Sequence, residues 1–189
     1  MWAILSLTYL LGAIPSGLLI AMGLRGIDPR KGGSGNIGAT NILRVAGKKE
    51  AILTLACDIL KGFSPIMVAR LFKMEDDHLL FIGLTVIIGH IFPVFLWFKG
   101  GKGVATSFGV FLGLSPSIAL MALGMWLMGV YLGKASSIGA LTAFGSLPLL
   151  AYLFRPSAPF VSFSVLVSVL VCMRHYENIQ RLIKGEERS

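Results

Sequence analysis

Charged residues are scarce in this sequence of 189 residues, and histidine and cysteine are scarcer still. Asp, Glu, Lys and Arg make up 14% of the chain, whereas a soluble domain carries about a quarter of such residues. This shortage excludes water as the main solvent of the fold. The 2 cysteines and 3 histidines form no CxxC or Cys/His ligand spacing, so the sequence predicts no disulfide framework, no metal site and no bound cofactor.

Apolar residues take the place of the missing charge. Hydrophobic residues make up 55% of the chain, and the mean hydropathy is +0.80. A spanning helix needs about 20 mostly apolar residues, and the candidate stretches are 2–24, 51–72, 79–98, 104–114, 117–133, 136–154 and 158–173. The sequence therefore predicts an all-α, polytopic transmembrane helix bundle in the lipid bilayer, with 1–189 as a single domain.

The distribution of Lys and Arg predicts how the helices are oriented. The net charge is +8, but the cations stand at the ends of apolar stretches rather than on one soluble face, so they indicate topology and not a nucleic-acid partner. They gather in the loop 25–50, in the turn 99–102 and in the tail after residue 173. The positive-inside rule places these segments and the C-terminus in the cytoplasm, and the N-terminus outside.

The segment 104–133 decides the number of spans. As one helix, its 30 residues would be about 45 Å long, too long for a core of about 30 Å. Ser115-Pro116-Ser117 offers a break, and a single crossing here would place the basic tail outside. We predict seven spans, with five as the alternative if this region is partly re-entrant.

A glycine-rich string, GGSGNIGATN, occupies residues 32–41 in the first cytoplasmic loop. Such a composition lets several backbone N–H groups turn toward one anion, and Gly33, Ser34, Gly35 and Asn36 are its first candidate ligands. No Lys-Ser/Thr pair follows the last glycine and no strand precedes the string, so it is neither a P-loop nor a dinucleotide fingerprint. The alternative is a flexible loop between helices.

A second glycine-rich cluster, KGGKGVATS, covers residues 99–107 at the start of a helix. Free N–H groups, a nearby lysine and hydroxyl groups favour anion binding there. The candidate ligands are Gly101, Lys102, Thr106 and Ser107. Two such loops on one membrane face make a stronger case than either loop alone.

A third polar cluster, RHYENIQR, begins at residue 174. His175 and Asn178 fall on one face at helical spacing, while Glu177 and Arg181 are spaced to pair with each other. The alternative for this cluster is a solvated helix end. On the same membrane face, Ser137 opens a helix and could cap it or bind an anion.

The ionisable residues Asp58, Lys61 and His90 fall inside the predicted spans. Such residues are functional candidates by default. Asp58 and Lys61, three residues apart, can neutralise each other, and Lys61 could extend toward a bend near Pro65. For this pair a structural role is the stronger hypothesis, whereas for His90 both hypotheses stay open.

Three strings in order, GSGNIGATN, GHIFPVF with GGKGVAT, and RHxENIxRL, resemble the bacterial acyl-phosphate-dependent glycerol-3-phosphate acyltransferase family. The resemblance extends over essentially the whole chain. It implies a multi-pass enzyme of the bacterial inner membrane whose active site faces the cytoplasm. Its implied reaction moves a fatty acyl group from acyl phosphate to the sn-1 hydroxyl of glycerol 3-phosphate, which gives lysophosphatidate and phosphate in the first step of phospholipid synthesis.

The resemblance also assigns residues. The implied catalytic positions are Ser34, Arg44, Lys102, His175 and Asn178. The phosphate-binding loop positions that it adds are Gly38, Ala39, Thr40 and Asn41, and Ser137 matches a polar substrate-binding position beside that loop. Arg44 and Lys102 would hold phosphates, the arginine through a bidentate fork and the lysine as a point charge.

Two mechanisms fit these residues, and both use His175. It either acts as the general base, or it orients glycerol 3-phosphate with Asn178 while a substrate phosphate takes the proton. We favour the second, because the phosphate must lie beside the attacking hydroxyl.

The HxxxxD pair of other acyltransferases is absent. The rival function is a transporter of a phosphorylated metabolite, which would need a site near the bilayer midplane. The residues carry no signal for an oligomeric state.

Overall fold

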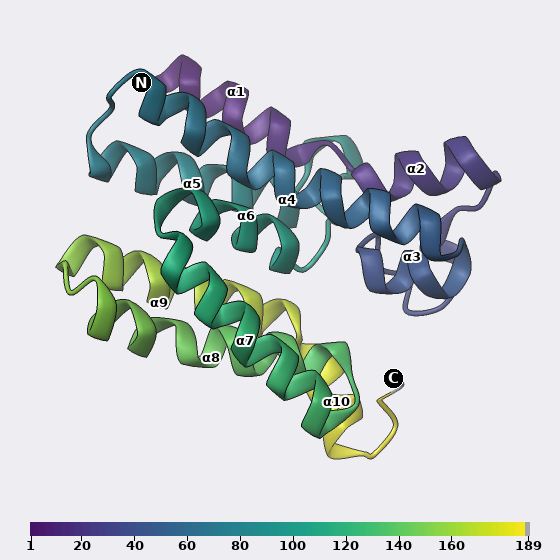
Figure 1. Cartoon of the computed structure of the whole chain (residues 1–189). Helices are drawn as coiled ribbons and strands as arrows, with labels where there is room; N and C mark the ends of the chain where they lie inside the picture. The colour runs from purple at the N-terminus through teal and green to yellow at the C-terminus, as the bar shows by residue number, and fades with distance from the viewer. Residues whose placement is uncertain (188–189) are drawn as a thin grey trace. The chain divides into compact units, whose positions relative to one another are not determined.

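The computed structural model describes residues 1–187, and the fold of this part is entirely helical, with no β-strand (Figure 1). Two short 3-10 helices, η1 (Pro29–Lys31) and η2 (Val94–Leu96), accompany ten α-helices. The α-helices are α1 (Trp2–Ala13), α2 (Ser16–Arg25), α3 (Ala39–Val45), α4 (Lys48–Leu71), α5 (Asp76–Ile91), α6 (Val104–Leu114), α7 (Pro116–Gly133), α8 (Ser136–Phe154), α9 (Ala158–Arg174) and α10 (Tyr176–Ile183). The all-α prediction is confirmed. The chain forms two compact units, Met1–Gly113 and the part that begins at Leu114.

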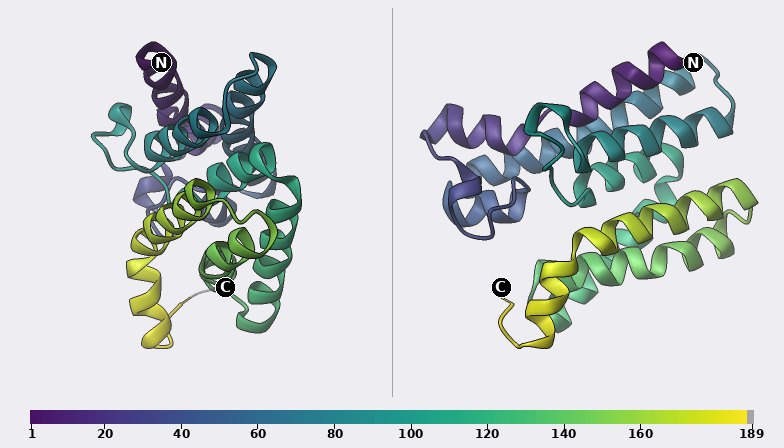
Figure 2. Two further views of the ribbon diagram at one scale, coloured as in Figure 1. Left: turned by 90° about the vertical axis from the view of Figure 1, so that its left-hand side faces the viewer. Right: turned by 180° about the vertical axis from the view of Figure 1, so that it is seen from behind.

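The first unit is held together by helices that approach one another closely. α1, drawn in purple (Figure 1, Figure 2), packs against α5, and α4 packs against α5 as well. At Gly12 in α1 an added methyl group would lie 3.1 Å from the Cα atom of Val86 in α5, so the two backbones are in contact. Glycine supplies this approach because it has no Cβ atom.

Other glycines also lie at helix contacts. A methyl group on Gly113 of α6 would lie 2.8 Å from a side-chain methyl of Ile66 in α4, and one on Gly129 of α7 would lie 2.9 Å from the Cα atom of Gly139 in α8. In the second unit, α8 packs against both α7 and α9. These glycines therefore allow close packing of their helices.

The first predicted span, 2–24, is not one helix. α1 ends at Ala13 and α2 begins at Ser16, with a bend of 41° between them. Pro15 lacks a backbone N–H and its ring clashes with the preceding turn, so the helix cannot continue through it. The expectation of one continuous first helix is therefore wrong.

The buried side chain of Lys61 donates a hydrogen bond to the backbone at this break. Its Nζ donates to the carbonyl oxygen of Ile14 at 3.0 Å and pairs with Asp58 Oδ1 at 2.9 Å. The predicted Asp58–Lys61 pair is confirmed. The expectation that Lys61 extends toward the bend near Pro65 is wrong, because its side chain is buried and donates to the Ile14 carbonyl, which also accepts from Ser16 N at 3.0 Å.

The predicted break in 104–133 is present, and it leaves α6 short. α6 and α7 are separated at Ser115, and the 11 residues of α6 extend about 16 Å at 1.5 Å per residue. Within the described chain, four helices are long and apolar enough to cross a membrane: α4, α5 with its continuation η2, α7 and α8. Counting the bent pairs α1–α2 and α9–α10 as one span each gives six.

The loop 25–50 is more structured than its glycine content suggests. It contains the end of α2, η1, the seven-residue helix α3 and the start of α4. Gly38 precedes α3, so the predicted phosphate-loop residues Ala39, Thr40 and Asn41 form a helical first turn rather than an open loop. An ion pair between Arg25 and the buried Glu50, with Nε 2.6 Å from Oε1, joins the end of α2 to the start of α4.

Candidate active site

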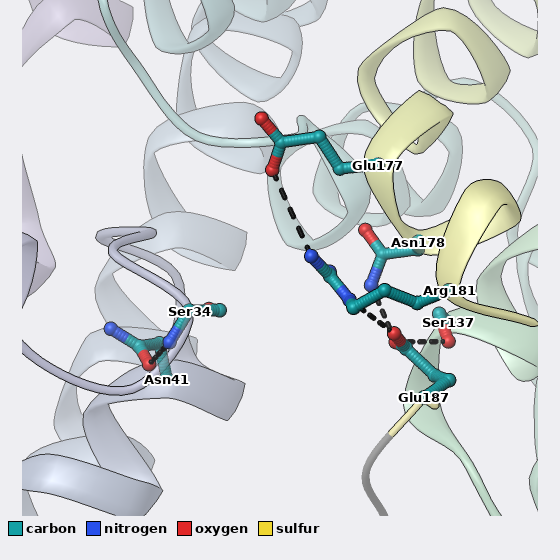
Figure 3. A network of polar contacts seen from close by, with 7 residues as sticks. All are labelled: Ser34, Asn41, Ser137, Glu177, Asn178, Arg181 and Glu187. Carbon is teal, nitrogen blue, oxygen red and sulfur yellow. Dashed lines mark hydrogen bonds and ion pairs between the residues drawn. The ribbon is translucent and has the colours of Figure 1, made fainter. Parts of the chain in front are cut away.

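The glycine-rich loop is wrapped around the side chain of Asn41. The Asn41 Oδ1 atom accepts from the backbone N–H of Ser34 at 2.7 Å (Figure 3). Its Nδ2 donates to the carbonyl oxygens of Pro29 at 2.9 Å, Gly32 at 3.2 Å and Asn36 at 2.8 Å. Asn41 is buried, with 2% of its surface exposed. Its side chain therefore holds the loop in shape, and the sequence pattern did not predict this role.

Two glycines make that wrapping possible. Gly33 and Gly35 have φ angles of 59° and 69°, in the left-handed region that favours glycine. A methyl group on Gly33 would also lie 3.2 Å from a Val45 side-chain methyl and against Asn41 Oδ1. Ser34, between these two glycines, is exposed at the tip of the loop. Asn36 Oδ1 accepts from Gly38 N at 2.8 Å, which closes the turn before α3.

A bidentate ion pair secures the entrance to this loop. The guanidinium of Arg30 donates from Nε to Asp28 Oδ1 at 2.9 Å and from Nη2 to Oδ2 at 2.8 Å. This hydrogen bonding lowers the pKa of the Asp28 carboxyl to about 2, so Asp28 stays ionised at neutral pH. Arg30 thus pairs at the base of the loop, and Arg44 lies on the exposed surface of α3.

The second cluster forms a tight turn that leads into α6. Gly100 N donates to Ile91 O and Gly101 N donates to His90 O, both at 3.2 Å, so the turn lies directly on the end of α5. Gly103 has a φ angle of 85°, which reverses the chain before α6 begins at Val104. Lys102, between these glycines, is half-buried.

The first turn of α6 carries two buried hydroxyl groups. Thr106 Oγ1 and Ser107 Oγ have no hydrogen-bond partner within residues 1–187, and both residues are 0% exposed. A buried hydroxyl without a partner costs about 1–3 kcal/mol. A bound substrate would supply the missing partner. The substrate-binding role of Thr106 and Ser107 stays a prediction.

A buried polar cluster lies behind the Lys102 turn. Asp58 Oδ1 is 2.9 Å from Lys61 Nζ and 3.7 Å from His90 Nδ1, and all three side chains are nearly fully buried. His90 lies against Gly101, where a methyl group would be 3.0 Å from Cε1 and 3.2 Å from Cδ2 of the imidazole. The imidazole thus supports the turn that carries Lys102.

In the second unit, His175 stands at the junction of α9 and α10. It is 3% exposed, and its Nδ1 lies 2.8 Å from the carbonyl oxygen of Val171. A carbonyl oxygen can only accept, so Nδ1 carries the proton and Nε2 is the acceptor atom of the neutral ring. This tautomer suits a contact with a hydroxyl group through Nε2.

Asn178 and Ser137 meet at the carboxylate of Glu187 (Figure 3). Ser137 Oγ donates to Glu187 Oε1 at 2.7 Å, and Asn178 Nδ2 donates to the same oxygen at 2.5 Å. Arg181 Nε pairs with Glu187 Oε2 at 2.8 Å, while the predicted Arg181–Glu177 pair is present at 4.0 Å. The sequence analysis missed Glu187, because nothing local relates it to a serine 50 residues away.

The predicted residues therefore fall into two sets. In the first unit the structure brings Ser34, Gly33, Asn36 and Gly38 together around Asn41, and it places Lys102 on a separate turn. In the second unit it brings Ser137 and Asn178 together. Each set combines a hydroxyl group with amide groups, which can donate to and accept from phosphate and polyol ligands.

Known proteins resemble this chain over nearly its whole length. A family model described as glycerol-3-phosphate acyltransferase matches residues 2–185. Curated relatives named glycerol-3-phosphate acyltransferase include one from Trichlorobacter lovleyi, 46% identical over 95% of this chain and 92% of its own, and one from Pseudomonas putida, 44% identical over 99% and 98%.

Solved structures show the same similarity. A crystal structure of PlsY (YgiH), an integral membrane glycerol 3-phosphate acyltransferase, in its glycerol 3-phosphate form has a TM-score of 0.93 and 39% identity. It covers 99% of this chain and 94% of its own. The lysophosphatidic acid form of the same enzyme has a TM-score of 0.88, with coverages of 99% and 93%.

Proposed function

This chain belongs to the glycerol-3-phosphate acyltransferase family, and from that premise we propose that it acylates the sn-1 hydroxyl of glycerol 3-phosphate with acyl phosphate as the donor. It is an acyltransferase of phospholipid synthesis and an integral membrane protein. The observation that carries the proposal is the family match over residues 2–185, which includes the sequence clusters at 32–41, 99–107 and 174–181.

The reaction needs no covalent enzyme intermediate. Acyl phosphate is a mixed anhydride, so the hydroxyl oxygen of glycerol 3-phosphate can attack the acyl carbon directly. An ester C–O bond forms, the C–O bond to phosphate breaks, and the hydroxyl proton ends on a phosphate oxygen. Positioning of the two substrates and stabilisation of negative charge then supply the catalysis.

Residues of the first unit take the phosphates in this proposal. Ser34 at the exposed loop tip, Arg44 on α3 and Lys102 on the second turn supply a hydroxyl group and two cations. The backbone N–H groups of Ser34, Gly35 and Gly38 donate to Asn41 Oδ1, Gly32 O and Asn36 Oδ1, so they hold the loop that carries Ser34 in shape rather than bind the phosphate. The arginine fork and the lysine point charge would bind phosphate in different geometries.

Residues of the second unit orient the acceptor. We assign His175 and Asn178 to glycerol 3-phosphate, with Ser137 beside them. The hydrogen bond from His175 Nδ1 to Val171 O leaves the Nε2 lone pair as the acceptor for a substrate hydroxyl. In this assignment the substrate phosphate takes the proton, and the histidine fixes the direction of attack.

The proposed topology has seven spans, with the N-terminus outside and the C-terminus in the cytoplasm of a bacterial inner membrane. Four long helices and two bent pairs give six crossings, and α6 would be a short seventh. This odd number agrees with the basic residues of the loop 25–50, the turn 99–102 and the tail, which the positive-inside rule places on one side. The active site would then face the cytoplasm.

Phosphate release from acyl phosphate by the purified protein tests the function. We expect release that depends on glycerol 3-phosphate and that is matched by formation of lysophosphatidate. A transporter of a phosphorylated metabolite would instead move glycerol 3-phosphate into proteoliposomes and release no phosphate. Release at the same rate without glycerol 3-phosphate would indicate a hydrolase and would contradict the proposal.

A further inference from the structure

The carboxylate of Glu187 is the centre of the polar cluster in the second unit. It accepts hydrogen bonds from Ser137 at the start of α8 and from Asn178 in α10, and it pairs with Arg181 one turn further along α10 (Figure 3). The Glu187 side chain is 7% exposed, while that of Arg181 is 35% exposed. A residue from the tail is thus buried against two positions assigned to substrate.

Hydrogen bonds keep the carboxylate of Glu187 ionised although it is buried. Partial burial by itself raises the pKa of the carboxyl, but the hydrogen bonds from Arg181, Asn178 and Ser137 together outweigh that effect, so the pKa lies below its ordinary value. Glu187 is therefore ionised at neutral pH. An ionised carboxylate can only accept hydrogen bonds, so each neighbour must present a donor to it.

This requirement fixes the rotation of the Asn178 amide. Its Nδ2 must face Glu187, which turns Oδ1 to the opposite side, as Figure 3 shows. The two faces of an amide differ in chemistry, since Nδ2 donates and Oδ1 accepts. A ligand that contacts this Oδ1 must donate a hydrogen bond to it, as a glycerol hydroxyl can and an ionised phosphate oxygen cannot.

We infer that Glu187 is a positioning residue for the acyl-acceptor substrate, which fixes Ser137 and the amide face of Asn178 so that Asn178 receives a hydroxyl hydrogen bond. The inference rests on the proposed function and deepens it. Glu187 itself touches no substrate in this account. Its effect reaches the reaction through Asn178, with Arg181 holding the carboxylate from its other oxygen.

A double-mutant cycle between Glu187 and Asn178 tests the inference. Kinetics of acyl transfer are measured for the full-length protein in detergent micelles, for Glu187→Ala, Asn178→Ala and the double variant. We expect Glu187→Ala to lower kcat/KM by about tenfold or more, because one lost orienting hydrogen bond to a charged group is of that size. In the Asn178→Ala background the same change should cost less than about threefold.

Two further variants separate positioning from general stability. Glu187→Gln keeps one acceptor oxygen of the same length but loses the ion pair with Arg181, so it should retain more activity than Glu187→Ala and show the same dependence on Asn178. This variant also keeps the test valid if the alanine variant does not fold. Glu186→Ala, which removes the exposed neighbouring acid, is the matched control and should behave as the parent.

The outcomes are distinct for the function and for the inference. A parent protein without acyl transfer would overturn the proposed function. An active parent in which Glu187→Ala and Glu187→Gln keep full kcat/KM would overturn the inference alone. Equal losses with Asn178 present and absent would also overturn it, because Glu187 would then act on the fold as a whole.

Discussion

Replacing Gly101 with alanine tests whether the turn that carries Lys102 depends on its close contact with His90. A methyl group at this position would lie 3.0 Å from Cε1 and 3.2 Å from Cδ2 of the imidazole, and closer still to Nε2. Non-bonded heavy atoms pack at roughly 3.5–4.0 Å, so relief of the Nε2 contact requires the ring or the turn to move by more than about 1 Å.

The imidazole has little room to move. His90 is 6% exposed, and its Nδ1 lies 3.7 Å from the Asp58 carboxylate, which is itself paired with Lys61. The turn 100–103 therefore takes up most of the displacement, and Lys102 moves with it. A misplacement of about 1 Å can cost on the order of a hundredfold in rate, so we expect Gly101→Ala to lose about that factor in kcat/KM.

The assay is steady-state acyl transfer by purified variants, with thermal unfolding in detergent as the check on folding. Gly124→Ala is the matched control, because a methyl group there meets nothing within 4 Å and the helix should gain roughly 0.5–1 kcal/mol. In a His90→Ala background, which removes the clashing ring, Gly101→Ala should add little further loss. Parental kcat/KM for Gly101→Ala, or an equal loss in both backgrounds, would refute the steric argument.

Four other predictions concern charge, mechanism, topology and pH. Arg44→Lys should lower kcat/KM by about tenfold despite the retained charge, because the bidentate fork is lost; unchanged kinetics would make Arg44 a topology residue. His175→Gln should raise KM for glycerol 3-phosphate and keep substantial turnover, whereas a normal KM with kcat reduced about a hundredfold would restore histidine as the base. In a variant without native cysteines, a cysteine at position 76 should be labelled from outside intact cells and one at position 186 should not. Because the pKa of Glu187 is lowered by folding, its stabilisation should be complete above the ordinary value of 4.5 and disappear as the pH falls below it; the unfolding midpoints of parent and Glu187→Ala should therefore differ at neutral pH and converge in acid.

The lengths of the apolar stretches predicted the helices and the break at Ser115, but they did not predict the break at Pro15. The break at Ser115 was predictable because the uninterrupted segment would be too long for a bilayer. The break at Pro15 was missed, because residues 2–24 have a length that suits one crossing and so gave no reason to divide them. The proline was the available signal, since its ring cannot continue a helix.

The sequence located the polar clusters along the chain, but it did not predict which of their side chains contact one another. Composition identified residues 32–41 as an ordered anion loop, but it did not distinguish Asn41, whose side chain makes four hydrogen bonds inside the loop, from residues that would face a ligand. Helix α3 was missed because its first turn begins within a string that reads as loop. Glu187 was missed because its partners depend on the tertiary fold.

An oxygen-18 experiment tests the central claim most directly, because it follows the bond that the reaction makes. Glycerol 3-phosphate labelled at the sn-1 hydroxyl is incubated with acyl phosphate and the purified protein, and the products are analysed by mass spectrometry. Attack of that hydroxyl on the acyl carbon predicts lysophosphatidate with the label in its ester and phosphate without label, in equal amounts. Free fatty acid with a labelled glycerol bisphosphate would show attack at phosphorus and would contradict the account.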